Sequence, residues 1–366
     1  MLLKSRDIYV ISGEAYDKLL AAGWFRGSRY MNKADYICVD GDILSPVHIR
    51  LPLTGHEFSK SQRKVMRKVE SQYRIEIDYP YICQQACDLY NKSKHKYQSF
   101  IYPDFDDAMS FVYRPKLSSF SVCVYDGDKL LAMSFFDMTK KSMASLICVY
   151  DLNYPELSLG YYTMLKEIEF AKKHKVKYYY PGYVMEDMKT FAYKFRIGEC
   201  EMKNGSGRWL PQSQVRHITT KSKKYKAEFN KLVAWLEGNG LKGRKRTYPL
   251  HYAYHPEYSD IPYYRYPLFY DMEINGERHV ATYDPEKGTY VWSLVKKSPN
   301  LKKVLNEFEM SVDFLTNPTY ELQLLETVRE VHLPIQLLDQ LQISISNPMG
   351  QWSDPMTSFK MKASVK

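Results

Sequence analysis

The chain has 366 residues, of which 45% are hydrophobic and 26% charged, proportions that exclude a fibrous or wholly disordered protein. Lys and Arg number 52 against 42 Asp and Glu, which gives a net charge of +10, and 33 tyrosines stand against 16 phenylalanines. The length predicts two domains, and the composition favours either an anionic, aromatic partner such as RNA or a basic protein with a tyrosine-rich core.

Residues 1–98 are predicted to form an N-terminal α/β lobe. Its segments are short, and apolar spacing distinguishes its helices from its strands. In chain order, we expect a helix over 13–23, strands near 36–39 and 47–51, a basic stretch over 59–74 and a helix over 80–98.

Residues 99–215 have the pattern of an α+β domain. Asp126-Gly127 lies between two β-prone runs, a combination typical of a tight hairpin. The order strand, turn, strand, strand, helix, strand is that of an N-acetyltransferase-like (GNAT) core. The expected segments are a loop or short helix over 99–118, hairpin strands over 119–139, a strand over 143–151, a helix over 159–175, a strand over 176–184, a short helix or bend over 188–198, and a final strand near Trp209.

Residues 216–366 are predicted to form a C-terminal strand-and-helix extension. A GxGxxG pattern runs from Gly238 to Gly243, but a helical pattern precedes it, so we interpret these glycines as a helix end rather than a dinucleotide loop. The expected segments are a basic amphipathic helix within 211–249, a linker over 243–249, strands over 250–300 with a hairpin at Asn275-Gly276, and two helices over 301–345.

The sequence predicts a cytoplasmic protein with no membrane partner and no metal. No window reaches the ~20 apolar residues that span a bilayer, and the N-terminus lacks a signal-peptide pattern. The six cysteines are too scattered for a disulfide framework. Cys83 and Cys87 are the one close pair, and no suitably spaced histidine accompanies them, so we expect buried free thiols.

The junction before the 159–175 helix lies where a GNAT enzyme binds the pyrophosphate of acyl-CoA through backbone N–H groups and the helix dipole. The usual signature is Gln/Arg-x-x-Gly-x-Gly/Ala. This chain has Glu156 to Tyr161 there, with a single glycine, Gly160, and no preceding cation. The sequence therefore disfavours acyl-CoA but retains a helix start suited to an anion.

Several motifs follow one another in the order of a known family. They are Tyr150-Asp151, Ser158-Leu159-Gly160, Tyr178 to Tyr183, Tyr193-Lys194 and Trp209, with weaker matches at 23–28, 45–51 and 58–64. Over roughly residues 15–210 the chain thus resembles the aminoacyl-tRNA–protein transferases, which include arginyl-tRNA–protein transferases and bacterial leucyltransferases. It departs from the family at His48, where Arg is usual, at Pro181, where Leu is usual, and in keeping only Cys38 of the N-terminal cysteines.

This resemblance implies transfer of an aminoacyl group from aminoacyl-tRNA to the N-terminal α-amine of proteins that begin with Asp or Glu, a form of N-degron tagging. It inclines toward arginyl over leucyl transfer. Aminoacyl-tRNA is then the co-substrate, and no cofactor is expected.

The resemblance also implies catalytic and tRNA-binding residues, each with a simpler alternative. Asp151 is a proton acceptor for the amine or a loop cap. Ser158 and the Gly160 amide bind the ester oxyanion or the terminal phosphate, and Ser158 also fits a helix N-cap. The terminal adenine of tRNA stacks on one or two of Tyr179, Tyr180 and Tyr183, or these are core residues. Lys194 binds phosphate or is solvated.

An acceptor protein that begins with Asp or Glu would need cationic side chains to bind its acidic first residue. Arg50, Arg63 and Lys64 are the candidates, because Arg can hold a carboxylate in a bidentate fork. The basic runs 221–226 and 242–246 are candidates for nonspecific contacts with the tRNA acceptor stem.

Three other functions remain open. They are an acyl-CoA-dependent N-acyltransferase of the GNAT fold, a Fem-like peptidyltransferase that uses aminoacyl-tRNA on cell-wall precursors, and a non-catalytic module that binds RNA or degrons.

Overall fold

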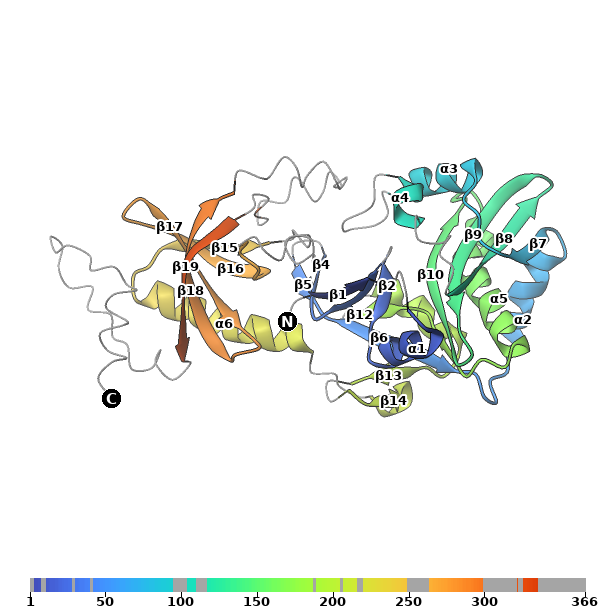
Figure 1. Ribbon diagram of the computed structural model, residues 1–366, viewed down its shortest axis with the longest axis horizontal. Helices are drawn as coiled ribbons and strands as arrows, with labels where there is room; N and C mark the ends of the chain where they lie inside the picture. The colour runs from blue at the N-terminus through green and yellow to red at the C-terminus, as the bar shows by residue number, and fades with distance from the viewer. Residues whose placement is uncertain are drawn as a thin grey trace.

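A nine-stranded mixed sheet makes up most of the larger end of the protein (Figure 1). The computed structural model describes residues 3–7, 11–27, 30–39, 42–94, 104–109, 117–186, 189–204, 207–215, 220–248, 263–298, 321 and 325–334. The strand order is β14-β13-β6-β11-β10-β9-β8-β7, and β12 pairs separately with β6. The strands are β6 (Pro46–Pro52), β7 (Arg74–Asp78), β8 (Ser118–Asp126), β9 (Lys129–Met138), β10 (Ser142–Tyr150), β11 (Tyr178–Tyr180), β12 (Tyr183–Met185), β13 (Glu201–Lys203) and β14 (Trp209–Pro211).

The centre of this sheet has the connectivity predicted from the sequence. Strands β8 and β9 form an antiparallel hairpin whose turn contains Gly127, with φ +56°, and β10 returns antiparallel to β9. The chain then crosses through helix α5 (Leu159–Lys173) to β11, which pairs parallel with β10. This succession confirms the predicted GNAT-like α+β core.

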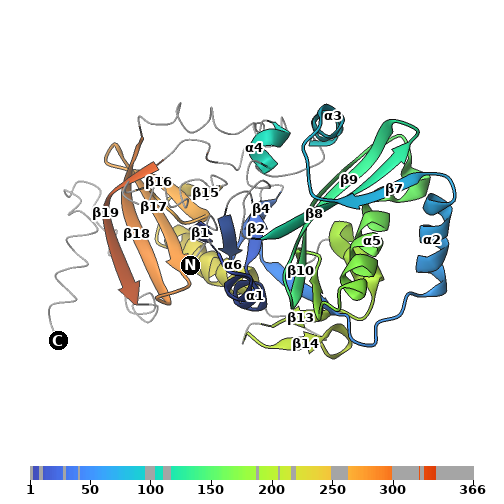
Figure 2. The same ribbon diagram turned by 45° about the vertical axis from the view of Figure 1, so that its right-hand side comes forward.

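Helices cover both faces of the sheet. Val122 and Val124 of β8 pack toward α5, whereas Cys123 and Tyr125 pack toward α3, as the period-two alternation of a strand requires. Figure 2 shows α5 and α2 on one side of these strands, and α3 and α4 on the other. Because both faces are covered, β8 and β9 are buried along most of their length. The other covering helices are α2 (Lys60–Glu70), α3 (Gln84–Ser93) and α4 (Phe105–Met109).

Helix α2 contains most of the basic stretch predicted at 59–74. It begins with a capping box, in which Ser59 and Gln62 satisfy each other's backbone N–H groups. The Gln62 side chain also donates to the backbone oxygen of Arg196 (2.8 Å). Met66 and Val69 are buried in the core cluster that includes α5. Short 3-10 helices occur at η2 (Pro155–Leu157), η3 (Lys189–Ile197) and η4 (Gln212–Gln214).

The strand predicted over 176–184 is two strands. Pro181 lacks an N–H for the ladder, and Gly182 has φ +89°, a conformation that glycine adopts without strain. The chain therefore leaves β10 after Tyr180. β11 pairs with both β10 and β6, whereas β12 pairs with β6 alone, with Tyr183 opposite His48.

Two small sheets lie between the ends of the molecule (Figure 1). One has the order β1-β3-β2, and helix α1 beside it buries Tyr16 and Leu20 against Ala144 and Tyr180 of the large sheet. The other is the hairpin β4–β5. Their elements are β1 (Leu3–Asp7), α1 (Gly13–Ala21), β2 (Phe25–Gly27), β3 (Tyr30–Ala34), β4 (Ile37–Val39) and β5 (Asp42–Leu44).

The C-terminal unit is a five-stranded antiparallel meander with one long helix. Helix α6 buries Tyr225, Phe229, Leu232, Val233 and Leu236, at helical spacing, against β16–β18. The end of the first strand lies beside the residues at and before the start of the last, since the Glu321 N–H donates to the Thr247 carbonyl (2.8 Å) and the Leu325 N–H donates to the Tyr248 hydroxyl (3.0 Å). The elements are α6 (Lys221–Gly238), β15 (Gly243–Thr247), β16 (Leu268–Ile274), β17 (Glu277–Asp284), β18 (Thr289–Lys297) and β19 (Leu325–Pro334).

Two expectations for this unit are confirmed and two are wrong. The GxGxxG glycines do end a helix, and Asn275-Gly276 does form a hairpin turn, with φ +54° and +77°. The expected linker over 243–249 is instead largely strand β15, whose exposed cations suit a sheet edge. The two helices expected over 301–345 are wrong for 325–334, which is β19, while the rest of that range, apart from Glu321, lies outside the described residues.

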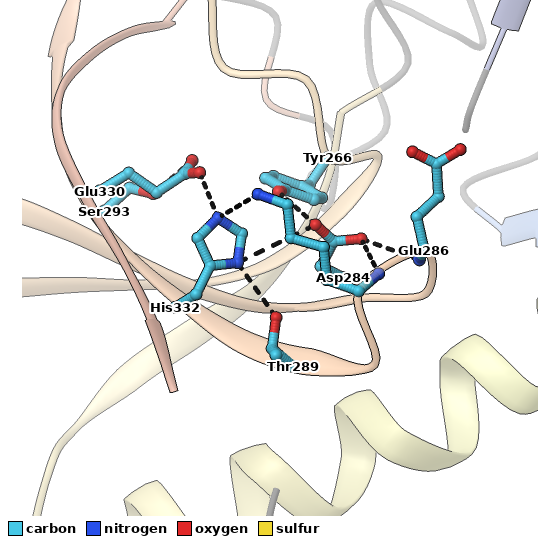
Figure 3. Close-up of polar contacts among 8 residues, drawn as sticks. Tyr266, Asp284, Glu286, Thr289, Ser293, Glu330 and His332 are labelled. Carbon is cyan, nitrogen blue, oxygen red and sulfur yellow. Dashed lines mark hydrogen bonds and ion pairs between the residues drawn. The ribbon is translucent and has the colours of Figure 1, made fainter. Parts of the chain in front are cut away.

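A polar cluster joins the β17–β18 turn to β19 (Figure 3). Asp284 accepts the backbone N–H groups of Glu286 (2.9 Å) and Lys287 (3.2 Å), which fixes the turn. His332 of β19 bonds to the Thr289 hydroxyl through Nδ1 (3.0 Å) and to Glu330 through Nε2 (2.9 Å). These contacts hold the hairpin against the neighbouring strand.

The units do not separate at the first predicted boundary. The large sheet takes β6 and β7 from residues 1–98 and its other strands from residues 99–215. Helix α6 packs on the β4–β5 hairpin, where Tyr36 and Ile43 enter the core of the C-terminal unit. Ion pairs of Lys221 with Asp35 (2.5 Å) and of Lys226 with Asp42 (2.6 Å) accompany this contact.

Candidate active site

A cavity of about 850 Å³ opens where strand β10 parts from its neighbour. β10 pairs with β11 only from Ser142 to Ala144, and its register against β9 shifts between Ser145 and Ile147. Such a bulge twists a strand away from the sheet. With β11 ending at Tyr180, the space beside the second half of β10 is left open.

Side chains from several elements enclose this space. The walls come from β10, the start of α5, the Pro181-Gly182 break, η3, and the segment that joins α1 to β2. Six of the ten predicted site residues line it, namely Asp151, Ser158, Gly160, Tyr180, Tyr183 and Lys194.

The start of α5 forms one wall. Ser158 adopts a left-handed conformation (φ +49°, ψ +48°), which is strained for a residue other than glycine, and its exposed side chain makes no capping hydrogen bond. The hydroxyl thus does not serve as the plain N-cap. A Cβ on Gly160 would lie 3.2 Å from the ring of Tyr150, so glycine here lets that ring pack against the helix start.

Asp151 lies at the rim as a paired carboxylate. Its Oδ1 accepts the backbone N–H of Asn153 (3.0 Å), and its Oδ2 pairs with Lys129 (2.8 Å). Burial alone would raise the pKa of Asp151, but these two contacts lower it below its ordinary value. The predicted loop cap is therefore present, and a carboxylate so stabilised is a weak proton acceptor.

Lys194 is a cation in the cavity wall with no acidic partner within ion-pair distance among the described residues. Its ammonium donates to the backbone oxygen of Tyr183 (2.9 Å) and lies 5.3 Å from the ring centroid of Phe191. It lies against Gly182, since a Cβ built on that glycine would be 3.4 Å from Nζ. Burial lowers the pKa of Lys194 to about 8.

Two further cavity residues were not selected as site residues from the sequence. His48 packs against Phe25 and Tyr183, and burial, with the charges of Lys33 and Lys203, lowers its pKa to about 4, so the ring is neutral at physiological pH. Arg26 pairs with the buried Asp137. His48 was noted only as a departure from the family, and nothing local in the sequence places Arg26 beside Asp137.

The other four predicted residues lie outside the cavity. Tyr179 is fully buried and donates to Glu167 (2.7 Å), so stacking on a tRNA base is incompatible with its position. Arg50 pairs with Glu201 (2.6 Å) and covers the rings of Tyr178 and Trp209.

Arg63 and Lys64 are exposed on α2. They do not line the cavity, and the Arg63 guanidinium donates to the backbone oxygen of Phe58. These two cations are accessible only to a ligand that reaches beyond the cavity.

Other groups of functional interest are distributed as follows. The six cysteines are free, with Cys38, Cys123 and Cys200 buried. Within the part of the chain that the structure describes, no three His, Cys, Asp or Glu side chains gather as metal ligands. Over the same residues, no helix combines the length and apolar character needed to cross a membrane.

Comparison with known proteins gives a family match for the part of the chain that supplies most of the cavity lining. Residues 74–204 match the family model of the arginine-tRNA-protein transferase C terminus. The chain is 27% identical over 205 residues to an aspartate/glutamate leucyltransferase of Campylobacter jejuni, which covers 53% of this chain and 82% of the relative. It is 26% identical over 209 residues to the enzyme of that name from Leptospira interrogans, with coverages of 55% and 79%.

Solved structures are more distant. The chain matches L-PGS from Bacillus licheniformis with 7% identity and a TM-score of 0.29, over 38% of this chain and 45% of that one. It matches a tandem GNAT protein from the clavulanic acid biosynthesis pathway with 12% identity and a TM-score of 0.31, over 44% and 51%. The chain thus spans about half the length of these two structures.

The family-model match and the curated relatives confirm the resemblance predicted from the motifs. They also confirm the enzyme class, a tRNA-dependent aminoacyltransferase. The family-model match ends before α6, so the C-terminal unit lies outside it.

Proposed function

We propose that this chain moves an aminoacyl group from aminoacyl-tRNA to the N-terminal α-amine of proteins that begin with Asp or Glu. The proposal starts from the family match of residues 74–204. The observation that carries the proposal is the cavity itself. One wall is the start of a helix, and another holds Lys194, a cation without an acidic partner among the described residues.

The main requirement of the reaction is that the protein holds the two substrates in position. The neutral α-amine attacks the ester carbonyl of aminoacyl-tRNA, a C–N bond forms, the ester C–O bond breaks, and the ribose oxygen leaves with a proton. Because the ester is already activated, holding the two substrates together supplies much of the rate.

The start of α5 is suited to the oxyanion of the tetrahedral intermediate. The first N–H groups of a helix have no partner within it, and the dipole favours negative charge there. The Ser158 hydroxyl is exposed at the same point and makes no capping bond. We assign the oxyanion to Ser158 and the Gly160 amide.

Lys194 is suited to the carboxylate of the acceptor's first residue. A half-buried ammonium is a strong partner for a carboxylate, since little water competes for either group. The sequence suggested Arg50 for binding the acidic acceptor, but Arg50 is already paired with Glu201, so we assign this role to Lys194 instead. Arg63 and Lys64 on α2 are available for tRNA phosphates.

The cavity favours a leucyl over an arginyl donor. Among its described lining residues Asp151 is the only carboxylate, and Lys129 pairs with it, whereas three cations, Arg26, Lys194 and Arg196, are present. A guanidinium would find no free acidic partner there. Apolar side chains such as Leu20, Ile37, Leu146, Ile147, Met164 and Met185 suit leucine.

A transfer assay with purified protein tests this proposal. Leucyl-tRNA and arginyl-tRNA, each labelled on the amino acid, are mixed with peptides that begin with Asp, Glu or Ala. We expect labelled leucine on the Asp and Glu peptides. Transfer to none of the peptides from either tRNA would overturn the proposed function, and arginine transfer alone would overturn the choice of donor.

A further inference from the structure

A carboxyl group is buried directly behind the cavity wall. Glu167 lies on the face of α5 that packs on the sheet and has 0% exposure. The Tyr179 hydroxyl donates to its Oε2 (2.7 Å). Its other oxygen, Oε1, has no hydrogen-bond partner among the described residues, and neither has the buried Ser134 hydroxyl nearby.

The position of Glu167 coincides with the point where β10 and β11 part. It is close to Ser134 of β9, to Ser145 of β10 and to Tyr179 of β11. Ser145 lines the cavity. Glu167 also acts electrostatically on Cys148 and Tyr193, which line the cavity too. One layer of side chains therefore separates the carboxyl from the cavity.

Packing alone does not account for an acid at this position. Burial of a carboxyl without a cation is unfavourable, and an orphaned oxygen adds the loss of a hydrogen bond. An amide or an apolar side chain would fill the same space at lower cost. Unsatisfied polar atoms of this kind are uncommon in proteins and call for a functional reason.

The surroundings keep Glu167 titratable near neutral pH. Burial raises its pKa to about 7, although the hydroxyls of Tyr179, Ser134 and Ser145 act in the opposite direction. The groups that face it from the packed elements are Ser134 of β9, Ser145 and Cys148 of β10, Tyr179 of β11 and Tyr193 of η3. None of these side chains carries a charge at neutral pH.

We propose that Glu167 is a positioning residue that takes up the proton of the attacking amine through Ser145, a role that rests on the proposed function. As the C–N bond forms, the amine proton passes to the Ser145 oxygen, and the Ser145 hydroxyl, which acts on the Glu167 carboxyl as a hydrogen-bond donor, passes its own proton to that carboxylate. The reverse transfer delivers a proton to the ribose oxygen as the C–O bond breaks. Atoms and charge balance, and Glu167 returns to its carboxylate form.

The test is the pH profile of kcat for Glu167→Gln, with Glu169→Gln as a surface control on the same helix. Wild type and control should show a steep acidic limb below about pH 7, with log kcat falling by about two per pH unit, because both the α-amine of the peptide and Glu167 must then be deprotonated. Glu167→Gln should lower kcat about 100-fold, leave the KM for peptide and tRNA unchanged, and reduce the slope of this limb to about one, the slope that protonation of the α-amine alone produces. Glu167→Asp should restore part of kcat.

Three outcomes decide the matter. A Glu167→Gln enzyme with wild-type kcat and the wild-type pH limb overturns the proton role. Wild-type protein that transfers no aminoacyl group overturns the proposed function instead. Where Glu167→Gln does not fold, Ser145→Ala takes its place, since that side chain is only half-buried. A limb whose slope falls to about one supports the relay, and a limb that keeps the wild-type slope of about two overturns it.

Discussion

The cavity of the large sheet and the C-terminal unit differ in whether their charged and polar side chains have bonding partners. In the C-terminal unit, Arg278 donates to both oxygens of Asp271 (2.9 Å each) and also to Glu321. In and behind the cavity, the Lys194 ammonium has no carboxylate partner among the described residues, and the Glu167 Oε1 has no hydrogen bond there. Polar groups that satisfy one another stabilise a fold, whereas groups left without partners in a cavity are available to a substrate.

The largest expected effect is that of Glu167→Gln on the free energy of unfolding, and it tests whether this carboxyl is costly to the fold. Glu167→Gln should make the protein more stable than wild type at pH 8 by about 3 kcal/mol. The folded-state pKa of about 7 lies above the unfolded value, so the contribution of Glu167 to stability is present at low pH and is lost as pH rises from about 4.5 to 7. Urea unfolding at pH 5 and pH 8 measures this change. A variant that is less stable than wild type at pH 8 would make Glu167 a structural residue.

Lys194→Met should weaken transfer to Asp-first peptides by about 2 kcal/mol in kcat/KM, roughly 30-fold, with little effect on an Ala-first peptide. With a pKa of about 8, Lys194 loses its charge as pH rises, so the preference for Asp over Ala should fade above pH 8. Lys64→Met, on the exposed face of α2 and outside the cavity lining, is the matched control and should keep the preference. Equal losses with both peptides would show that Lys194 does not read the acidic residue.

Arg278→Ala should test the other half of the comparison. Removing this cation leaves Asp271 and Glu321 without their shared partner, and we expect a loss of about 1.5 kcal/mol in unfolding free energy, between the values for surface and buried pairs. The kcat for transfer, measured well below the unfolding temperature, should stay at the wild-type value. A large fall in kcat would mean that the C-terminal unit takes part in the chemistry.

Ser158→Gly should give the smallest change. Glycine removes the strain of the left-handed conformation, so stability should rise by about 0.5–1 kcal/mol, while loss of the hydroxyl should lower kcat roughly tenfold. Thermal melting and single-turnover transfer measure the two effects. A Gly variant that keeps full activity would leave the oxyanion to the backbone alone.

Local sequence patterns predicted those elements of the fold that depend on contacts between residues close together in the chain. The Asp126-Gly127 hairpin, α5 and the glycines after α6 follow from turn chemistry and helical spacing. Strand β15 was missed because its residues, GRKRT, have the charge of a solvated linker, and only pairing with β16 makes them a strand. The two-strand break at Pro181-Gly182 was missed because pairing with β6 is a long-range contact.

Long-range contacts also explain what the sequence did and did not indicate about the site. Motif order selects Ser158, Gly160, Tyr183 and Lys194 as site residues, and all four line one cavity. Glu167 looks like an ordinary helical glutamate, and its burial arises only from packing against three strands.

Many of the described tyrosines belong to the core. Among the largest fully buried side chains are Tyr16, Tyr162, Tyr179, Tyr225, Tyr248, Tyr264, Tyr270, Tyr283 and Tyr290. Composition alone therefore could not distinguish a ring that stacks on RNA from one that fills the interior.

The most direct test of the account is the initial rate of leucine transfer from labelled leucyl-tRNA to an Asp-first peptide, compared for wild type and Lys194→Met. The account predicts label on the peptide N-terminus with wild type and a roughly 30-fold lower kcat/KM with the variant. No label with wild type, or equal values for the two proteins, would contradict it.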